Sequence, residues 1–398
     1  MILALVFWAA FAVFAGIGFV YFRDLGDVSQ MVLRVKRENM LRFIRAEKRL
    51  LTIGGAAGGA ALILNLLTGA GPGWAVWLGL ILAAAFYGFP RVWVHLGLRN
   101  QQRTARYVPI EEARKWVNPS ASVLVIENDG AARAHPDYEL SRPHLAGSPE
   151  GLAGENVVMT YCGMANLGLA YIPEIDGAPV DLEVLAQHGN NLVLRDNATG
   201  EPIQQICGWR ERDGPDGPRM RLWPTFRMSF SGFQRAYPEG EVFLNRPAGN
   251  LLLRLLDMGL DALFSVSLAR HHRESRPVMD NMSRYDDRLP NKTYVWGATV
   301  GDAAACWTRD FVAERGVVNA ELGGRRLVLA YDPLLDSLGA WWLPGEAPAT
   351  RVDFRGESDQ GPLQRVETLR PGMFWHVWFE FNPQTEVNPI LDAEAAAA

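Results

Sequence analysis

The sequence predicts N-terminal transmembrane helices followed by a β-rich body of the α+β class that is built from an internal duplication. Three observations predict this fold class. Three apolar segments lie within residues 1–90, and each is close to the length that a helix needs to cross a bilayer. Beyond Pro119, short alternating runs of apolar and polar residues are separated by Gly and Pro, as in strands joined by turns. Two stretches of this part also resemble each other.

The first apolar segment, residues 1–22, contains no charged side chain. As a helix it would be ~33 Å long, which is enough to span the hydrocarbon core. A cleaved signal peptide would need a basic start and a small-residue cleavage site, and neither precedes Arg23. Residues 51–68 and 74–90 form a second pair of spans, joined by the turn-forming residues 69–73. The alternative is that these segments are buried helices of a soluble core.

Four glycines in the second span stand at the spacing of a helix contact. Gly54 and Gly58 form one small-xxx-small pair, and Gly55 and Gly59 form another. Small residues at this spacing let transmembrane helices approach closely. We therefore expect helix packing in the membrane at these four positions.

The distribution of basic residues predicts the orientation of the anchor. Eight Lys and Arg lie between the first and second spans and four follow the third, whereas the N-terminal flank and the hairpin tip carry none. The positive-inside rule then places the N-terminus outside and the body in the cytoplasm. Residues 29–50 mix basic and apolar side chains, which predicts an amphipathic helix on the anionic lipids of the inner leaflet.

The body that follows the anchor is acidic. Of the 39 Lys and Arg and the 44 Asp and Glu, residues 1–106 hold twelve basic and four acidic ones, which leaves 27 basic and 40 acidic for the rest. A nucleic-acid partner would need a basic surface, so we expect none. Cys162, Cys207 and Cys306 are too few and too scattered for a disulfide framework or a closed zinc site.

The β-rich part contains an internal sequence repeat. Residues 123–172 and 293–343 each read as a strand, a turn, a second strand, an Ala-rich segment and a hairpin, and similar phrases follow at 232–243 and 376–388. Repetition in this order predicts a duplication. The chain is therefore divided into a membrane region (1–106), a first β-rich repeat (107–246), an insertion with an apolar helix and a linker (247–285), a second β-rich repeat (286–390) and a disordered tail (391–398).

Five phrases of the body resemble those of a bacterial family. They are VVMTYC, LVLRDNATGE, YDDRLPNKTYVWGATVGDAAACW, GVVNAELGGRRLVLAYDP and FNPQTEV, and they cover most of residues 119–390. In this order they are similar to the family named domain of unknown function 3179. The resemblance implies a β-rich duplicated fold and no particular activity.

The resemblance also points to a thiol position. In the family the phrase that matches VVMTYC usually continues as a Cys-Pro-x-Cys pair, preceded by a His-Glu pair. This sequence retains Cys162 and His144, but Ala165 stands at the second thiol position and Leu145 follows the histidine. The chain therefore looks like a degenerate member, in which an inherited site is incomplete.

A copper site is the chemical alternative at this position. Met164 and Met228 could complete a copper(I) site with Cys162 and His144, because thiolate and thioether sulfurs are soft donors. The protein would then be a thiol- or copper-binding redox protein. Against this, Cys often serves as a small buried hydrophobe and Met as a core filler.

The insertion contains an apolar helix over residues 250–270. Arg254, Asp257, Asp261 and Ser265 recur at spacings of three and four, so they form one narrow polar stripe. Three placements of this helix fit the pattern: packing into the body's own core, docking on a partner, or lying on the membrane. The residues expected to make a partner or membrane contact are Leu252, Leu255, Leu256, Leu263 and Phe264.

Motifs for common chemistries do not occur in the sequence: it has no phosphate-binding loop, dinucleotide-binding glycine pattern or nucleophile elbow. We interpret His271 and His272, beside Arg270, as the solvated C-terminus of a helix. We therefore expect a membrane-anchored accessory or scaffold protein without catalytic residues or cofactor. Its expected partners are membrane lipids and either another membrane protein or a second copy of the chain.

Overall fold

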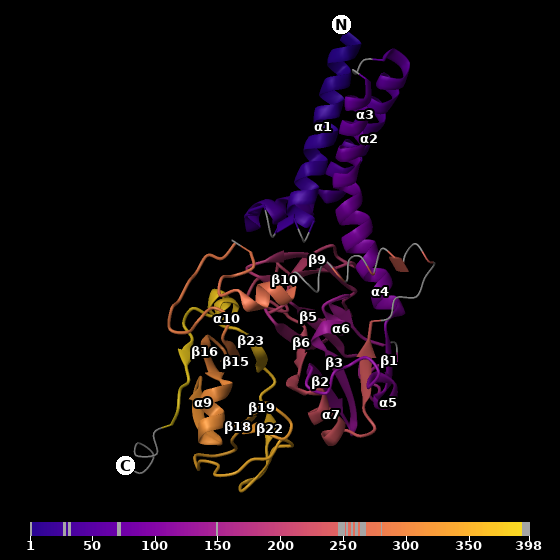
Figure 1. Ribbon diagram of the computed structural model, residues 1–398. Coiled ribbons are helices and arrows are strands. Elements are labelled where there is room, and N and C mark those ends of the chain that lie inside the picture. Colours follow the sequence, from indigo (N-terminus) through magenta and orange to yellow (C-terminus); the bar gives the residue numbers. More distant parts are fainter. Residues whose placement is uncertain are drawn as a thin grey trace.

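A stalk of long helices stands on a larger body of short strands (Figure 1). This computed structural model describes residues 2–391, apart from 27–28, 31–32, 70–72, 149, 246–250, 280 and, between 252 and 267, every position other than 254, 255, 258 and 262. The predicted tail lies almost wholly outside the described residues. The order of apolar helices followed by a sheet-rich body confirms the predicted fold class at this level.

The stalk contains three helices that are long and apolar enough to cross a membrane, at Ile2–Leu25, Arg37–Thr68 and Gly73–Gly97. These helices indicate that the protein is associated with a membrane. The predicted basic helix over 29–50 is not a separate element, because its helical part begins at Arg37 and continues into the second span. The elements are α1 (Ile2–Leu25), α2 (Arg37–Thr68), α3 (Gly73–Gly88), the π-helix η2 (Phe89–Gly97) and α4 (Leu98–Thr104).

The four glycines of α2 divide into two faces. A Cβ atom at Gly54 would overlap the hydroxyl of Tyr87 on α3, and one at Gly58 would lie 2.8 Å from the ring of Phe14 on α1. At Gly55 and Gly59 a Cβ would meet no atom within 4 Å. Only the first pair therefore packs inside the stalk, and the second pair faces outward.

Two sheets of the body share a strand order over four strands. One runs β1-β14-β3-β2-β13 and the other, written in the same direction, β24-β16-β15-β23, so that only the edge strand β1 has no counterpart. In the first, β2 is antiparallel to β13 and β3, and β14 is parallel to β3. In the second, β15 is antiparallel to β23 and β16, and β24 is parallel to β16. The strands are β1 (Arg106–Pro109), β2 (Ser122–Asn128), β3 (Ala131–Pro136), β13 (Phe226–Ser229), β14 (Glu241–Leu244), β15 (Tyr294–Val300), β16 (Ala303–Thr308), β23 (Arg370–Phe374) and β24 (Glu386–Val387).

A second pair of sheets runs β12-β6-β5-β4 and β22-β19-β18-β17. Each is built around one antiparallel hairpin, β5–β6 or β18–β19. The strands are β4 (Leu145–Ala146), β5 (Val158–Cys162), β6 (Leu167–Ile172), β12 (Arg221–Trp223), β17 (Val317–Leu322), β18 (Arg325–Asp332), β19 (Ser337–Trp342) and β22 (Gln364–Arg365). Besides the insertion, the helices among the described residues of the body are α5 (Ile110–Ala113), α6 (Asp137–Leu140), α7 (Phe230–Ala236), α9 (Arg309–Arg315) and α10 (Trp375–Phe381).

A fifth sheet lies under the stalk (Figure 1). It contains β9 (Leu182–His188), β10 (Asn191–Asp196) and β11 (Pro202–Gln204), in the order β11-β10-β9. In the chain it stands between β6 and β12. At the corresponding place between β19 and β22, the described residues form the short hairpin β20 (Glu357–Ser358) and β21 (Gly361–Pro362). A similar short hairpin, β7 (Glu174–Ile175) and β8 (Ala178–Pro179), precedes β9.

The stalk and the fifth sheet share one buried core, which we call the neck core. On α2, Met40, Phe43 and Ile44 recur at helical spacing, so they lie on one face. That face was expected to lie on lipid, but protein covers it, because β9 and β10 offer an apolar surface of their own. The neck core consists of Tyr21, Leu25, Val35, Met40, Phe43, Ile44, Leu185, Ala186 and Val193.

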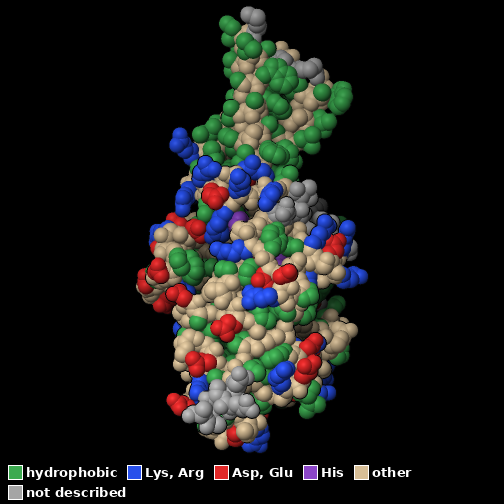
Figure 2. All heavy atoms as spheres, turned by 90° about the vertical axis from the view of Figure 1, so that its left-hand side faces the viewer, with side chains coloured by type: hydrophobic (Ala, Val, Ile, Leu, Met, Phe, Trp, Pro, Cys, Tyr) green, Lys and Arg blue, Asp and Glu red, His purple; other side chains and the backbone are tan. Residues whose placement is uncertain are grey.

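Polar contacts surround the neck core. Arg195 of β10 pairs with Glu47 of α2 at 2.8 Å, and Arg37 pairs with Glu211 at 2.5 Å. Figure 2 shows apolar side chains over the stalk and a band of Lys and Arg where the stalk meets the body. The stalk is therefore attached to the body by side-chain packing as well as by the chain itself.

Candidate functional site

The two halves of the body meet at a seam where each hairpin turn reaches the other half. The turn of β5–β6 accepts a hydrogen bond at the carbonyl of Ala165 from the backbone N–H of Phe374, at 2.9 Å. The turn of β18–β19 accepts one at the carbonyl of Leu335 from the N–H of Ser229, at 3.0 Å. Phe374 and Ser229 both stand where a strand passes into a helix, α10 or α7. The two contacts are therefore reciprocal.

Each of the two turns is closed by a hydrogen bond of the same kind, from a tyrosine hydroxyl to an Asn or Asp side chain. Tyr161 donates its hydroxyl to Oδ1 of Asn166 at 3.1 Å, and Tyr331 donates its hydroxyl to Oδ1 of Asp336 at 2.7 Å. Asn166 and Asp336 have φ values of 51° and 52°, in the left-handed region that Asn and Asp tolerate better than most residues. The sequence VVMTYC therefore ends in a turn of defined shape.

A buried arginine holds the seam together. Arg227 of β13 pairs with Asp137 and donates to Oγ of Ser122 at 2.5 Å. It also donates to the carbonyl of Asn166 at 3.1 Å and, across the seam, to that of Pro371 at 3.2 Å. Its side chain is therefore bonded to four different segments of the body.

His144 and Cys162 lie on neighbouring strands. The β4–β5 register pairs Leu145 with Thr160, which brings His144 beside Tyr161. Nδ1 of His144 donates to the carbonyl of Tyr161 at 3.0 Å, and burial lowers the pKa of His144 to about 4. The Cys162 thiol donates to Oε1 of Gln187 at 3.4 Å. Both side chains are therefore engaged by the protein.

The other predicted sulfur donors lie in different surroundings. Met164 packs at the edge of the core cluster that contains Cys162, whereas Met228 belongs to a second cluster with Phe226 and Phe230. The three cysteines are not in disulfides. Within the described residues, no group of three or more His, Cys, Asp and Glu side chains could hold a metal ion. A copper(I) site with methionine ligands stays a prediction.

The described part of the insertion helix is exposed at its start, and Leu268, His271 and His272 near its end are partly buried. Leu251 and Leu255 are 72% and 55% exposed, so these two positions are not part of the body's core. The remaining residues predicted to dock, Leu252, Leu256, Leu263 and Phe264, lie outside the described residues. At the other end, His272 donates from Nε2 to the carbonyl of Gly163 at 2.7 Å.

The insertion thus covers the turn that follows Cys162. A Cβ atom at Gly163 would lie 2.9 Å from Cδ1 of Leu268, so a larger residue at this position would displace the helix end. His272 was expected to be solvated, but it is half-buried, because the turn lies against it.

A cluster of polar side chains surrounds Phe374 on the same side of the seam. His272 meets the Phe374 ring edge-on at 5.0 Å, and Tyr294 stacks on it at 5.4 Å. His376 stacks at 5.8 Å, and Nζ of Lys292 lies 4.4 Å from the ring centre. No local sequence pattern predicts this cluster, because its members come from the insertion and the second repeat. Only the phrase LPNKTYVWG, which contains Lys292 and Tyr294, drew attention to part of it.

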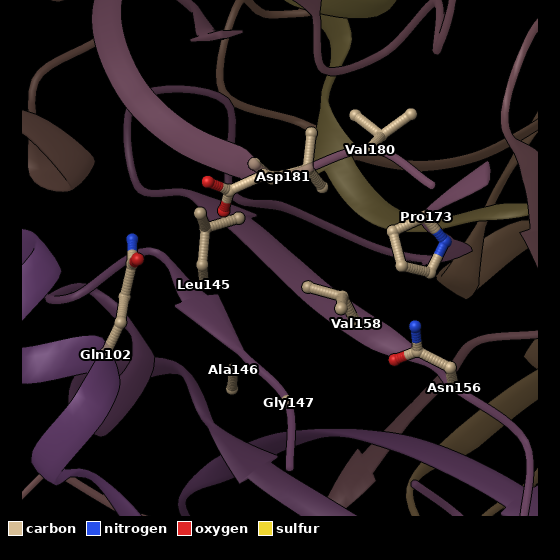
Figure 3. A pocket seen from close by; sticks show the side chains of 10 residues that line it. Gln102, Leu145, Ala146, Gly147, Asn156, Val158, Pro173, Val180 and Asp181 are labelled. Carbon is tan, nitrogen blue, oxygen red and sulfur yellow. The ribbon is translucent and has the colours of Figure 1, made fainter. Parts of the chain in front are cut away.

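The body also has a small cavity beside α4. It measures about 260 Å³ and lies between the β4–β5 hairpin and the start of β9. Figure 3 shows Gln102 and Asp181 on one side of it and Pro173, Val158 and Asn156 on the other. Nε2 of Gln102 is buried and has no hydrogen-bond partner within the described ranges.

Comparison with known proteins identifies the family. Residues 88–385 match the family described as "Protein of unknown function (DUF3179)". No curated protein and no solved structure matches the chain. The matched region begins at the end of α3 and includes the residues on both sides of the seam. The chain is therefore a member of the DUF3179 family.

Proposed function

We propose that this protein is a membrane-anchored accessory or scaffold protein, without catalytic activity, that contributes to a larger membrane assembly. The neck core carries the proposal. Domains joined by a linker with a small interface move relative to each other, but here α1 and α2 share buried side chains with β9 and β10. A body held in one orientation above the membrane suits a protein that positions partners.

The outward faces of the stalk and insertion are the proposed contact surfaces. Gly55 and Gly59 leave open space on α2, and transmembrane helices associate closely where small residues recur at this spacing. Leu251, Leu255 and Met258 of the insertion are more than half exposed. The partner is a membrane protein or a second copy of the chain, and lipids surround the remaining surface.

Matched glycine variants test this proposal. Gly55→Leu and Gly59→Leu should reduce a native complex, extracted in mild detergent, to the size of the single chain without changing its thermal stability. Gly54→Leu should lower the thermal stability instead, because its side chain would overlap Tyr87. Native mass spectrometry and thermal unfolding measure both effects. A wild-type protein that migrates as a lone chain with no co-purifying subunit would contradict the proposal.

The body lies on the cytoplasmic side of the bacterial inner membrane, with the N-terminus outside. The band of Lys and Arg at the base of the stalk supports this orientation (Figure 2). In intact cells a membrane-impermeant maleimide should label Thr68→Cys, at the stalk tip, and should label Ala347→Cys, on the exposed surface of the body, only after permeabilisation. The opposite pattern would place the body outside.

The two halves of the body derive from one duplicated unit. The matching strand orders of both pairs of sheets support this origin. So do the reciprocal hydrogen bonds at the seam and the Tyr–Asx hydrogen bond in each turn. The fifth sheet, β11-β10-β9, is then an addition to the first half that attaches the stalk.

A further inference from the structure

We infer that Lys292 is a nucleophilic amine that binds a small carbonyl compound, an aldehyde or a ketone, as a reversible imine. The site lies at the seam, between the end of the insertion helix and the start of α10, and it is independent of the partner surfaces proposed above.

The backbone on either side of Lys292 is fixed against α10. The carbonyl of Asn291 accepts from the N–H of His376 at 3.1 Å, and that of Thr293 accepts from the N–H of Trp375 at 2.9 Å. These bonds aim the side chain of Lys292 at the ring of Phe374. Nζ of Lys292 is buried and has no hydrogen-bond partner among the described residues.

The choice of lysine at this position is unusual for the chain. Only four of its 39 basic residues are Lys, and Lys36, Lys48 and Lys115 are exposed. A guanidinium stays charged in proteins, whereas a buried ammonium can lose its proton and become a nucleophile. The position that faces the ring of Phe374 is therefore occupied by the cationic side chain that can become neutral.

The surroundings of Lys292 favour the neutral amine. Burial lowers its pKa to about 8, against the smaller opposite effect of Glu274. At pH 7 such a group has roughly 200-fold more neutral amine than a lysine at the ordinary pKa of ~10.4. The titratable or charged groups that act on this cluster include His271, His272, Tyr294, His376, Glu274, Asp137 and Arg227.

His376 supplies a proton acceptor in the same cluster. It is 4% exposed, and its Nδ1 lies 2.6 Å from the carbonyl of Asn291. A carbonyl only accepts, so Nδ1 carries the proton and Nε2 has the lone pair. Its Nε2 is buried and meets no hydrogen-bond partner in the part of the chain that the structure describes. Burial lowers the pKa of His376 to about 4, which keeps it neutral at pH 7.

The chemistry needs no oxidant or cofactor. The lone pair of Nζ attacks the carbonyl carbon, and a proton passes from nitrogen to oxygen with His376 as the relay. The carbinolamine then loses water and leaves a C=N bond to Nζ. Water reverses both steps, so the compound is released unchanged.

Reductive trapping on the full chain in detergent tests the site. The protein is incubated with pyridoxal at pH values between 6 and 11, and timed samples are quenched with borohydride, which reduces the imine to a stable amine. Peptide mass spectrometry follows all four lysines. At pH 7 we expect Lys292 to be modified at least tenfold faster than Lys115, with a half-maximal rate near pH 8. An unmodified Lys292 in the folded protein, or a rate that rises only near pH 10, overturns the inference.

Two variants separate the roles of the side chains. Lys292→Arg should abolish the fast modification and leave the other three lysines unchanged. His376→Gln should slow the modification of Lys292 severalfold with no change at Lys115. An unchanged rate in this second variant would remove His376 from the site. Loss of the native complex in the glycine variants has no effect on this readout, so the two proposals fail separately.

Discussion

Replacement of Arg227 by alanine is expected to lower the free energy of unfolding of the body by about 3–5 kcal/mol, the usual cost of removing one partner of a buried ion pair. Arg227 is 8% exposed. Its removal leaves the carboxylate of Asp137 without its counter-ion. The carbonyls of Asn166 and Pro371 lose a donor at the same time, and both lie where the halves meet.

Arg235→Ala is the matched control for this experiment. Arg235 is exposed, and it also crosses the seam, with a single bond to the carbonyl of Leu334 at 3.0 Å. A change of less than about 1 kcal/mol is expected there, as for most surface substitutions. Denaturant unfolding followed by tryptophan fluorescence measures both variants. Equal destabilisation by the two would show that Arg227 is not the centre of the seam.

Replacement of Glu47 by alanine is expected to loosen the stalk from the body, with a cost of about 3 kcal/mol for the uncompensated Arg195. The two side chains are only 7% and 15% exposed, and their pair joins α2 to β10. Hydrogen exchange should therefore accelerate in β9 and β10, which contribute Leu185, Ala186 and Val193 to the neck core, while the seam stays protected.

A double-mutant cycle isolates this contact. Glu47→Ala and Arg195→Ala together should cost less than the sum of the two single variants, because the pair is lost only once. The exposed pair between Arg106 and Glu112, at 2.7 Å, is the control, and its loss should cost at most about 0.5 kcal/mol. Additive effects of the Glu47 and Arg195 variants would mean that the ion pair does not attach the stalk.

Part of the candidate site could be predicted from the sequence. The phrase that ends at Cys162 and the phrase that contains Lys292 were both found from their resemblance to a family, and both lie at the seam. The partners of each could not be found in this way. Gln187, which accepts from the Cys162 thiol, and His272, which covers the turn after it, come from distant parts of the chain with no local pattern that links them.

The sequence by itself determined the three apolar helices, the β-rich body and the acidic charge of that body, because each depends on composition and on short-range periodicity. Tertiary structure decided which glycines of α2 face inward and which face of its basic segment is covered by β9 and β10. It also decided which buried amine lies beside Phe374. These outcomes depend on contacts between residues far apart in the chain, and a periodic pattern shows that a face is apolar without showing what will cover it.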